Sequence, residues 1–206
     1  MQFAGHFETH LTVAARSTAD AARLSVWACG RGLKLTHIVL DRGLTPSQPM
    51  VTRHARGRLA GQIVEAREIA AALAGEGLAA SRIKIEVAPD NADVPQSDKQ
   101  AASQPADRYF EHHLKLLLPR EADIGRILTI ASPAGGHVSR NALKRRGDGR
   151  QERFVTQRCY GVGRDRAEAQ FSRLFHTLRS GGVEILDAER EYVVYDDNLA
   201  ADAGWM

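Results

Sequence analysis

A seven-residue pattern occurs twice in this chain, and it constrains the fold more than any other feature. Residues 7–13 are FETHLTV and residues 110–116 are FEHHLKL, so Phe, Glu, His and Leu recur at the same spacing. Further matches follow in the same order in the two halves: Val51-Thr52 with Val155-Thr156, and Asn91 with Asn198. Matches in the same order along both halves indicate that one ancestral unit was duplicated.

Both halves also predict the same order of secondary structure. Runs of apolar and β-branched residues predict strands, and amphipathic stretches that end at glycine predict helices. In the first half we expect strands at 7–13, 33–40, 50–54 and 82–87, and helices at 18–29 and 58–77. In the second half we expect strands at 109–118, 137–144, 153–160 and 189–196, and helices at 120–131 and 164–182. Ser17 is the expected N-cap of the first helix, and Asp165 with Glu168 forms an expected capping box for the last.

The order strand, helix, strand, strand, helix, strand is the ferredoxin-like pattern, whose antiparallel sheet carries both helices on one face. The sequence therefore predicts an α+β protein, a tandem duplication of two ferredoxin-like βαββαβ units. Two such units either close their open faces on each other or build a shared barrel, and we expect antiparallel sheets that face a shared cleft. The expected units are residues 1–91 and 108–206. Residues 92–107, rich in Pro, Ser and Gln, are expected to be a linker or surface loop.

Alternation along a strand predicts which residues of the repeated pattern face that cleft. Phe7, Leu11 and Val13 share one face with Thr9, and we expect this apolar row to meet the helices. The opposite row should line the cleft. In the two repeats this polar row is Glu8, His10 and Thr12, and Glu111, His113 and Lys115.

Composition fits an ordinary globular protein, with 206 residues of which 43% are hydrophobic and 26% charged. No apolar run is long enough for a membrane span, and the first residues lack the pattern of an export signal. We therefore expect a cytoplasmic protein without a membrane partner, with Cys29 and Cys159 as reduced thiols. A basic run could bind nucleic acid, although the formal charge is only +3 and a solvated hairpin is the favoured interpretation. This run comprises Arg140, Lys144, Arg145, Arg146, Arg150, Arg153 and Arg158. The sequence leaves the oligomeric state open.

The polar rows predict acid–base chemistry as the leading function, without a cofactor. Histidine exchanges protons near neutral pH, so His10 and His113 would be the catalytic pair on a small anionic substrate. The segment His10–Val13 resembles the His-x-Thr-hydrophobic motif of the 2H phosphoesterase superfamily, itself a duplicated two-lobed fold. The resemblance implies a phosphoesterase-like hydrolase in which the two histidines are general base and acid, and the residue two positions on holds phosphate. Thr12 matches that position, whereas Lys115 replaces the expected Thr or Ser of the second motif.

Further roles and two alternatives complete the sequence-based hypotheses. Arg140 would help to hold the anion, and Glu8 and Glu111 would orient the imidazoles. The first alternative is a lyase, isomerase or hydrolase with a divalent transition metal, because imidazoles and carboxylates are its common ligands. Its expected ligands are Glu8, His10, Glu111 and His113. The second alternative is a non-catalytic binding or partner protein.

Overall fold

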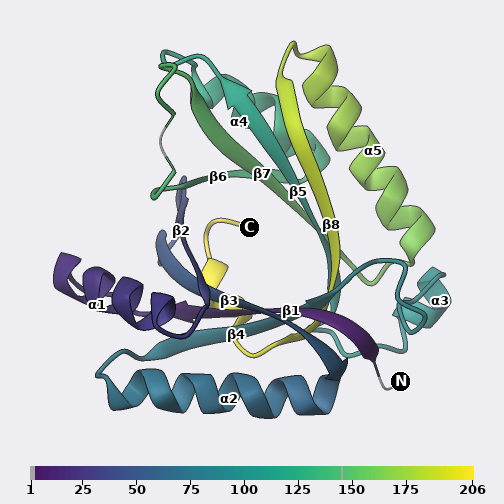
Figure 1. Cartoon of the computed structure of the whole chain (residues 1–206). Helices are drawn as coiled ribbons and strands as arrows, with labels where there is room; N and C mark the ends of the chain where they lie inside the picture. The colour runs from purple at the N-terminus through teal and green to yellow at the C-terminus, as the bar shows by residue number, and fades with distance from the viewer. Residues whose placement is uncertain (1–2, 145) are drawn as a thin grey trace.

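The computed structural model describes residues 3–144 and 146–206, which form two consecutive βαββαβ units (Figure 1). The first unit consists of β1 (Ala4–Val13), α1 (Thr18–Cys29), β2 (Lys34–Leu40), β3 (Ser47–Arg58), α2 (Leu59–Gly75) and β4 (Ala80–Val87). The second consists of β5 (Tyr109–Leu118), α4 (Ile124–Ala131), β6 (Gly136–Asn141), β7 (Gln151–Tyr160), α5 (Arg164–Ser180) and β8 (Glu184–Asp196). The predicted α+β class and the duplication are confirmed.

The two sheets join into one closed barrel, with the strand order β1-β3-β2-β6-β7-β5-β8-β4. Each unit keeps the same internal order, β4-β1-β3-β2 and β8-β5-β7-β6, and the seams are the antiparallel pairs β2–β6 and β4–β8. The predicted fold, two ferredoxin-like units whose antiparallel sheets face a shared cleft, is confirmed, and of the two arrangements considered it is the shared barrel that forms. Edge strands carry unpaired backbone groups, and closing the barrel pairs the edges of each unit with those of the other. The expected cleft is the barrel interior.

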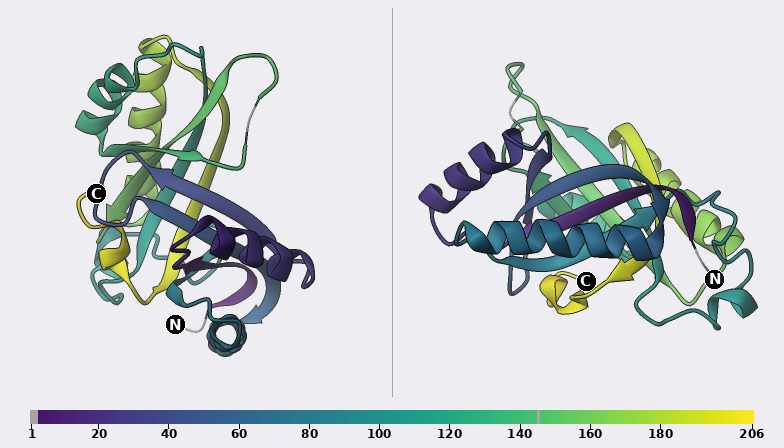
Figure 2. Two further views of the ribbon diagram at one scale, coloured as in Figure 1. Left: turned by 90° about the vertical axis from the view of Figure 1, so that its left-hand side faces the viewer. Right: turned by 60° about the horizontal axis from the view of Figure 1, so that its bottom comes forward.

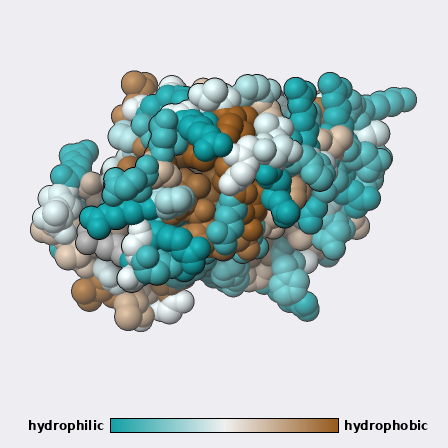
Figure 3. All heavy atoms as spheres, turned by 90° about the horizontal axis from the view of Figure 1, so that it is seen from above, coloured by the Kyte–Doolittle hydropathy of each residue, from teal (hydrophilic) through white to brown (hydrophobic). Residues whose placement is uncertain are grey.

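The helices lie outside the barrel, so each unit has its own hydrophobic core between strands and helices (Figures 1 and 2). Phe7, Leu11 and Val13 of β1 belong to the first core, and Leu114 and Leu116 of β5 belong to the second. The predicted facing of the apolar row is confirmed. The face seen from above is largely hydrophilic, with a strip of hydrophobic atoms near its centre (Figure 3).

The segment between the units is more ordered than the predicted linker. It contains a short helix, α3 (Asp98–Ala101), which Ser97 caps, and its Val94 is buried in the first core. The segment also packs against Gly163, the residue before α5, because the Asp98 carboxylate accepts a hydrogen bond from the Gly163 N–H at 2.8 Å. A Cβ at position 163 would overlap the backbone of Ser97. This contact fixes the start of α5.

Helix starts agree with the sequence in one case and differ in another. Ser17 caps α1 as predicted, since its hydroxyl accepts a hydrogen bond from the Asp20 N–H at 3.1 Å. The capping box predicted for α5 does not form. Gly163 is the N-cap of this helix, and no side chain among the described residues caps it. No helix in the described part of the chain combines the length and apolar content that crossing a lipid bilayer requires.

The residues that follow β8 pack against the barrel. A short 3₁₀ helix (Leu199–Asp202) follows β8, and the indole Nε1 of buried Trp205 donates a hydrogen bond to the Val138 carbonyl at 2.9 Å. Asp202 and Trp205 thereby line one part of the barrel interior.

Candidate functional site

The barrel interior contains a cavity of about 310 Å³, lined by side chains from all eight strands and from the C-terminal segment. Alternation places the polar row of each repeat in it. Glu8, His10 and Thr12 line the cavity from β1, and Glu111, His113 and Lys115 line it from β5. In the structure the two polar rows line one shared cavity, as the sequence predicts.

Each imidazole is held by a threonine on the neighbouring strand. His10 Nδ1 hydrogen-bonds to the Thr52 hydroxyl at 2.8 Å, and His113 Nδ1 hydrogen-bonds to the Thr156 hydroxyl at 2.9 Å. The pairing of β1 with β3 and of β5 with β7 puts each threonine directly opposite its histidine. Both Nε2 atoms are consequently left to face the carboxylates of the interior.

A chain of ionic groups connects the two histidines. His10 Nε2 lies 2.8 Å from Glu86 Oε2, and Lys84 Nζ lies 2.8 Å from Glu86 Oε1. Lys84 also pairs with Glu111. Glu111 Oε2 in turn lies 3.3 Å from His113 Nε2. The imidazoles from the two units therefore belong to one electrostatic system.

The buried carboxylates of this system have strongly perturbed pKa values. Burial alone would raise the pKa of Glu86, but the Lys84 ammonium and the His10 imidazole lower it to about 2. Burial likewise opposes ionisation of Glu111, but Arg158 and Lys84 hold its pKa well below the usual range. Glu191 shows the opposite behaviour: burial and the nearby Glu86 carboxylate raise its pKa to about 10. The site thus contains more carboxylates than its cations neutralise.

Three residues of this system form a possible metal-binding group. One ligand atom each from Glu86, His113 and Glu191 can be chosen so that all three lie within 4.8 Å of one another. They come from β4, β5 and β8, and therefore from both units. Because β4 and β8 are neighbours at a barrel seam, their side chains are closer than those on opposed sheets would be.

This group differs from the predicted metal ligands, with which it shares only His113. Glu111 is already engaged, since Arg158 Nε donates to its Oε1 at 2.5 Å and Lys84 donates to its Oε2. Glu8 lies at the other histidine, with its Oε1 3.5 Å from His10 Nε2 and its Oε2 3.6 Å from His54 Nδ1. The predicted four-residue set is thus not assembled around one point.

Of the three predicted anion-binding residues, two lie inside the barrel and one lies outside it. Thr12 and Lys115 line the cavity, and Lys115 Nζ lies 3.2 Å from a Glu152 carboxylate oxygen. Arg140 does not lie in the cavity. Its neighbours Ser139 and Asn141 do, so alternation turns the exposed Arg140 outward. The predicted position of Arg140 in the cleft is therefore wrong.

The basic run does not form one continuous patch. Arg158 is buried inside the barrel, where it pairs with Glu111 and Asp202. Arg146 and Arg150 both pair with Asp148 in the β6–β7 hairpin. Arg145 lies outside the described residues.

Sequence reasoning missed Glu86 and Glu191, although the two residues occupy equivalent positions in the strand pairing of the two units. Glu86 lies opposite Glu8, and Glu191 lies opposite Glu111, so the two glutamates are equivalent in the two units. A register shift after Ile85 hides this equivalence, because aligning the two final strands by their asparagines matches Glu86 with Val193. The sequence did offer one signal: Glu189 and Glu191 are two residues apart, so they lie on the same face of the strand.

Comparisons with known proteins come from solved structures alone. No protein-family model matches the chain, and no curated protein matches its sequence. A mutant chlorite dismutase from Candidatus Nitrospira defluvii has 12% identity and a TM-score of 0.31, over 92% of this chain and 91% of that chain. A proposed monooxygenase from Fusobacterium nucleatum subsp. nucleatum has 9% identity and a TM-score of 0.34, over 97% and 96% of the chains. The regulatory subunit of aspartate kinase from Thermus thermophilus has 13% identity and a TM-score of 0.31, over 86% and 95%. Scores this low define neither a family nor an activity for this chain.

Proposed function

We propose that this protein is an enzyme that binds a divalent transition metal inside its barrel and acts on a small molecule there. The observation that carries the proposal is the group of Glu86, His113 and Glu191, whose ligand atoms lie within 4.8 Å of one another. Carboxylate oxygens and imidazole nitrogens are common ligands of Zn²⁺, Mn²⁺ and Fe²⁺. Three protein ligands leave coordination positions for water or substrate.

The surroundings of the three residues support a cation at this point. Glu86 is buried, and its two oxygens lie 2.8 Å from Lys84 Nζ and from His10 Nε2. Buried carboxylates are normally paired or coordinated to metal, and a metal at this point would add to the ion pair with Lys84. His113 has its Nδ1 engaged by the Thr156 hydroxyl, and metal-ligating histidines typically have their second nitrogen fixed in this way.

His10 is the proposed proton carrier beside the metal. A bound divalent metal would polarise a substrate oxygen or activate a water molecule. His10 is not one of the three ligands, yet its Nε2 lies 2.8 Å from the ligand Glu86. An imidazole at this position could take or return the proton that such a reaction moves.

A second candidate function is metal-free acid–base catalysis by His10 and His113, as the resemblance to 2H phosphoesterases implies. The favouring observation is that both histidines line one cavity and are held in the same way, by Thr52 and Thr156. Activity that survives complete removal of metal would favour this candidate over the first.

Metal titration of the purified protein tests the proposal. After treatment with a chelator, the wild type should bind one equivalent of Co²⁺ or Mn²⁺, and the Co²⁺ absorption spectrum should report mixed nitrogen and oxygen ligands. His113→Gln and Glu191→Gln should each weaken binding by at least about 10-fold, because each removes one ligand. Glu189→Gln is the matched control, since Glu189 lines the cavity from the same strand but is outside the group. A wild type that binds no stoichiometric metal, or an unchanged Glu191→Gln affinity, would contradict the proposal.

A further inference from the structure

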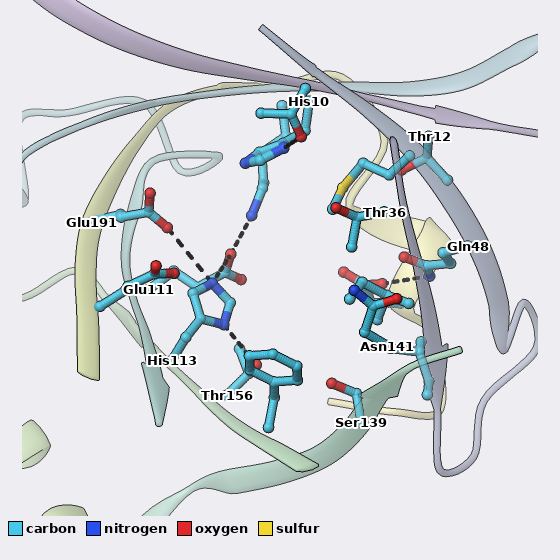
Figure 4. Close-up of a pocket in the computed structure, with 18 of the residues that line it drawn as sticks. His10, Thr12, Thr36, Gln48, Glu111, His113, Ser139, Asn141, Thr156 and Glu191 are labelled. Carbon is cyan, nitrogen blue, oxygen red and sulfur yellow. Dashed lines mark hydrogen bonds and ion pairs between the residues drawn. The ribbon is translucent and has the colours of Figure 1, made fainter. Parts of the chain in front are cut away.

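The cavity has two chemically different walls (Figure 4). The wall that carries Glu111, His113 and Glu191 is ionisable. Opposite it lies a second wall built mainly by β2, β3 and β6, which we call the neutral wall. The neutral wall comprises Thr12, Thr36, Ile38, Leu40, Gln48, Met50, Ser139, Asn141 and Phe154. A ligand between the walls meets mainly charged groups on one side and mainly uncharged polar and apolar groups on the other, although Lys34 and Lys144 also line the cavity.

Two hydroxyl groups on the neutral wall have no protein partner. Thr12 and Ser139 are only 4% and 3% exposed, and within the described chain neither hydroxyl makes a hydrogen bond. Thr52 and Thr156 line the same cavity, but their hydroxyls are occupied by the histidines. Both oxygens are accessible from the cavity, where water or a bound molecule can be their hydrogen-bond partner. They are therefore available to bind a hydroxyl group of a ligand.

The charged groups of the cavity indicate the charge of that molecule. Three buried cations are neutralised: Arg82 pairs with Asp196 and Asp202, Arg158 with Glu111 and Asp202, and Lys84 with Glu86 and Glu111. Lys34, Lys115 and Lys144 also line the cavity, and Lys115 and Lys144 share the carboxylate of Glu152. These lysines and the proposed metal would attract an anionic group, such as the carboxylate of a small acid.

Size and apolar lining limit the ligand further. A volume of about 310 Å³ holds roughly ten water molecules and is at the lower end of small-molecule sites. Ile38, Leu40, Met50 and Phe154 stand among the hydroxyl groups. A ligand that is polar on every side would leave them without apolar contact.

We infer that the substrate is a small hydroxylated carboxylic acid. Its carboxylate faces the ionisable wall, its hydroxyl groups bond to Thr12 and Ser139, and its carbon skeleton lies along the apolar side chains of the neutral wall. The inference rests on the proposed function for the metal that attracts the carboxylate. The two unpaired hydroxyls carry the rest of it independently of the metal.

Binding of matched acids tests the inference on the Mn²⁺-loaded wild type by calorimetry. The probes are mandelate with phenylacetate and gluconate with hexanoate, in which the second acid of each pair lacks hydroxyl groups. We expect the hydroxylated acid of at least one pair to bind at least about 10-fold more tightly, because a site built for a hydroxyl rejects the analogue without it. Thr12→Val and Ser139→Ala should each weaken binding of that acid about 3- to 10-fold and leave its counterpart unchanged.

Thr9→Val is the matched control for these variants. Thr9 lies on the same strand, is also buried with an unpartnered hydroxyl, and faces away from the cavity. This variant should bind the acids like the wild type. A wild type that binds neither acid of both pairs, or does not discriminate within them, overturns the inference, as does an equal effect of Thr9→Val and Thr12→Val.

Metal titration of the same samples separates the two proposals. Thr12→Val and Ser139→Ala should bind Mn²⁺ like the wild type, because neither is a ligand. If the wild type binds Mn²⁺ but does not prefer hydroxylated acids, the substrate inference is wrong and the metal proposal stands. If no Mn²⁺ binds, the metal proposal is wrong, and the hydroxyl preference measured on the metal-free protein decides the inference.

Discussion

At the residue scale, the two threonines that hold the histidines should differ in their effect on metal affinity. Thr156 fixes His113, a proposed ligand, whereas Thr52 fixes His10, which is outside the metal-binding group. Loss of a residue that orients a metal ligand typically lowers metal affinity 10- to 100-fold. We expect Thr156→Val to weaken Mn²⁺ binding by about 10-fold or more.

The equivalent change in the first unit provides the control. Thr52→Val should cost about as much stability as Thr156→Val, about 1 kcal/mol in urea denaturation, because each loses one buried hydrogen bond. It should leave Mn²⁺ affinity within about 3-fold of the wild type. Equal losses of metal affinity in the two variants would contradict the assignment of His113 as the ligand.

Sequence patterns predicted the facing of these residues but not all of their contacts. Alternation along the repeated strand was sufficient to bring His10 and His113 into one space, because side chains on a strand alternate strictly. The partners Thr52 and Thr156 were visible as repeated residues, yet their role depends on the register between strands. The prediction for Arg140 failed for a different reason, because alternation within its own strand turns it outward from the cavity that Ser139 lines.

At the element scale, the start of α5 depends on a close approach that tolerates only glycine. A Cβ at Gly163 would overlap backbone atoms of Ser97 and Gln96, which cannot move aside like the end of a flexible side chain. Overpacking of this kind typically costs 1 to 3 kcal/mol. We therefore expect Gly163→Ala to lower the free energy of unfolding by about 1–3 kcal/mol in urea denaturation.

Gly61 within α2 is the matched control for this substitution. A Cβ at Gly61 would meet nothing within 4 Å. Alanine is favoured over glycine inside a helix by about 1 kcal/mol, so Gly61→Ala should stabilise the protein. Destabilisation by both variants would show that the contact with Ser97 is not what matters.

Elements were predictable where the signal is local. The cap at Ser17 and the span of α1 agree with the sequence, because capping and helix termination depend on a few adjacent residues. The capping box at Asp165 did not form, since the packing of the connecting segment on Gly163 sets the helix start instead. A register shift in the pairing of β4 with β8 likewise hid the equivalence of Glu86 and Glu191.

At the scale of the whole molecule, closure of the barrel could not be derived from local patterns. Alternation predicts which face of a strand is polar, but it does not determine whether two sheets oppose each other or join at their edges. The seam between β4 and β8 decides the site, because it brings Glu86 close to Glu191. Two opposed sheets would bring other residues together. The predicted metal ligands Glu8, His10, Glu111 and His113 were chosen for such opposed sheets, and only His113 belongs to the group in the structure.

The C-terminal segment is held to the barrel by Asp202, and this contact should be visible in the pH dependence of stability. The Asp202 carboxylate accepts hydrogen bonds from Arg82 Nη1 at 2.8 Å, Arg158 Nη2 at 2.6 Å and Gln48 Nε2 at 2.8 Å. Burial alone would raise the pKa of Asp202, but the two guanidinium groups outweigh it and lower the pKa. A carboxylate with a lowered folded-state pKa contributes stability that is complete above its unfolded-state pKa of about 4 and is lost as the pH falls through the folded-state pKa.

Asp202→Asn should therefore destabilise the protein most near neutral pH, by about 1.5–3 kcal/mol, because the charge-assisted hydrogen bonds from two buried arginines are weakened. Asp196 and Glu111 still pair with the two arginines in this variant. Urea denaturation of both proteins from neutral pH to about pH 3 measures the difference in the free energy of unfolding. The other buried carboxylates, Glu86 and Glu111, make both proteins less stable in acid, so the informative quantity is the difference between them. We expect that difference to shrink as the pH falls below about 4, and a difference that stays constant over this range would show that Asp202 is not the ionised anchor of the C-terminal segment.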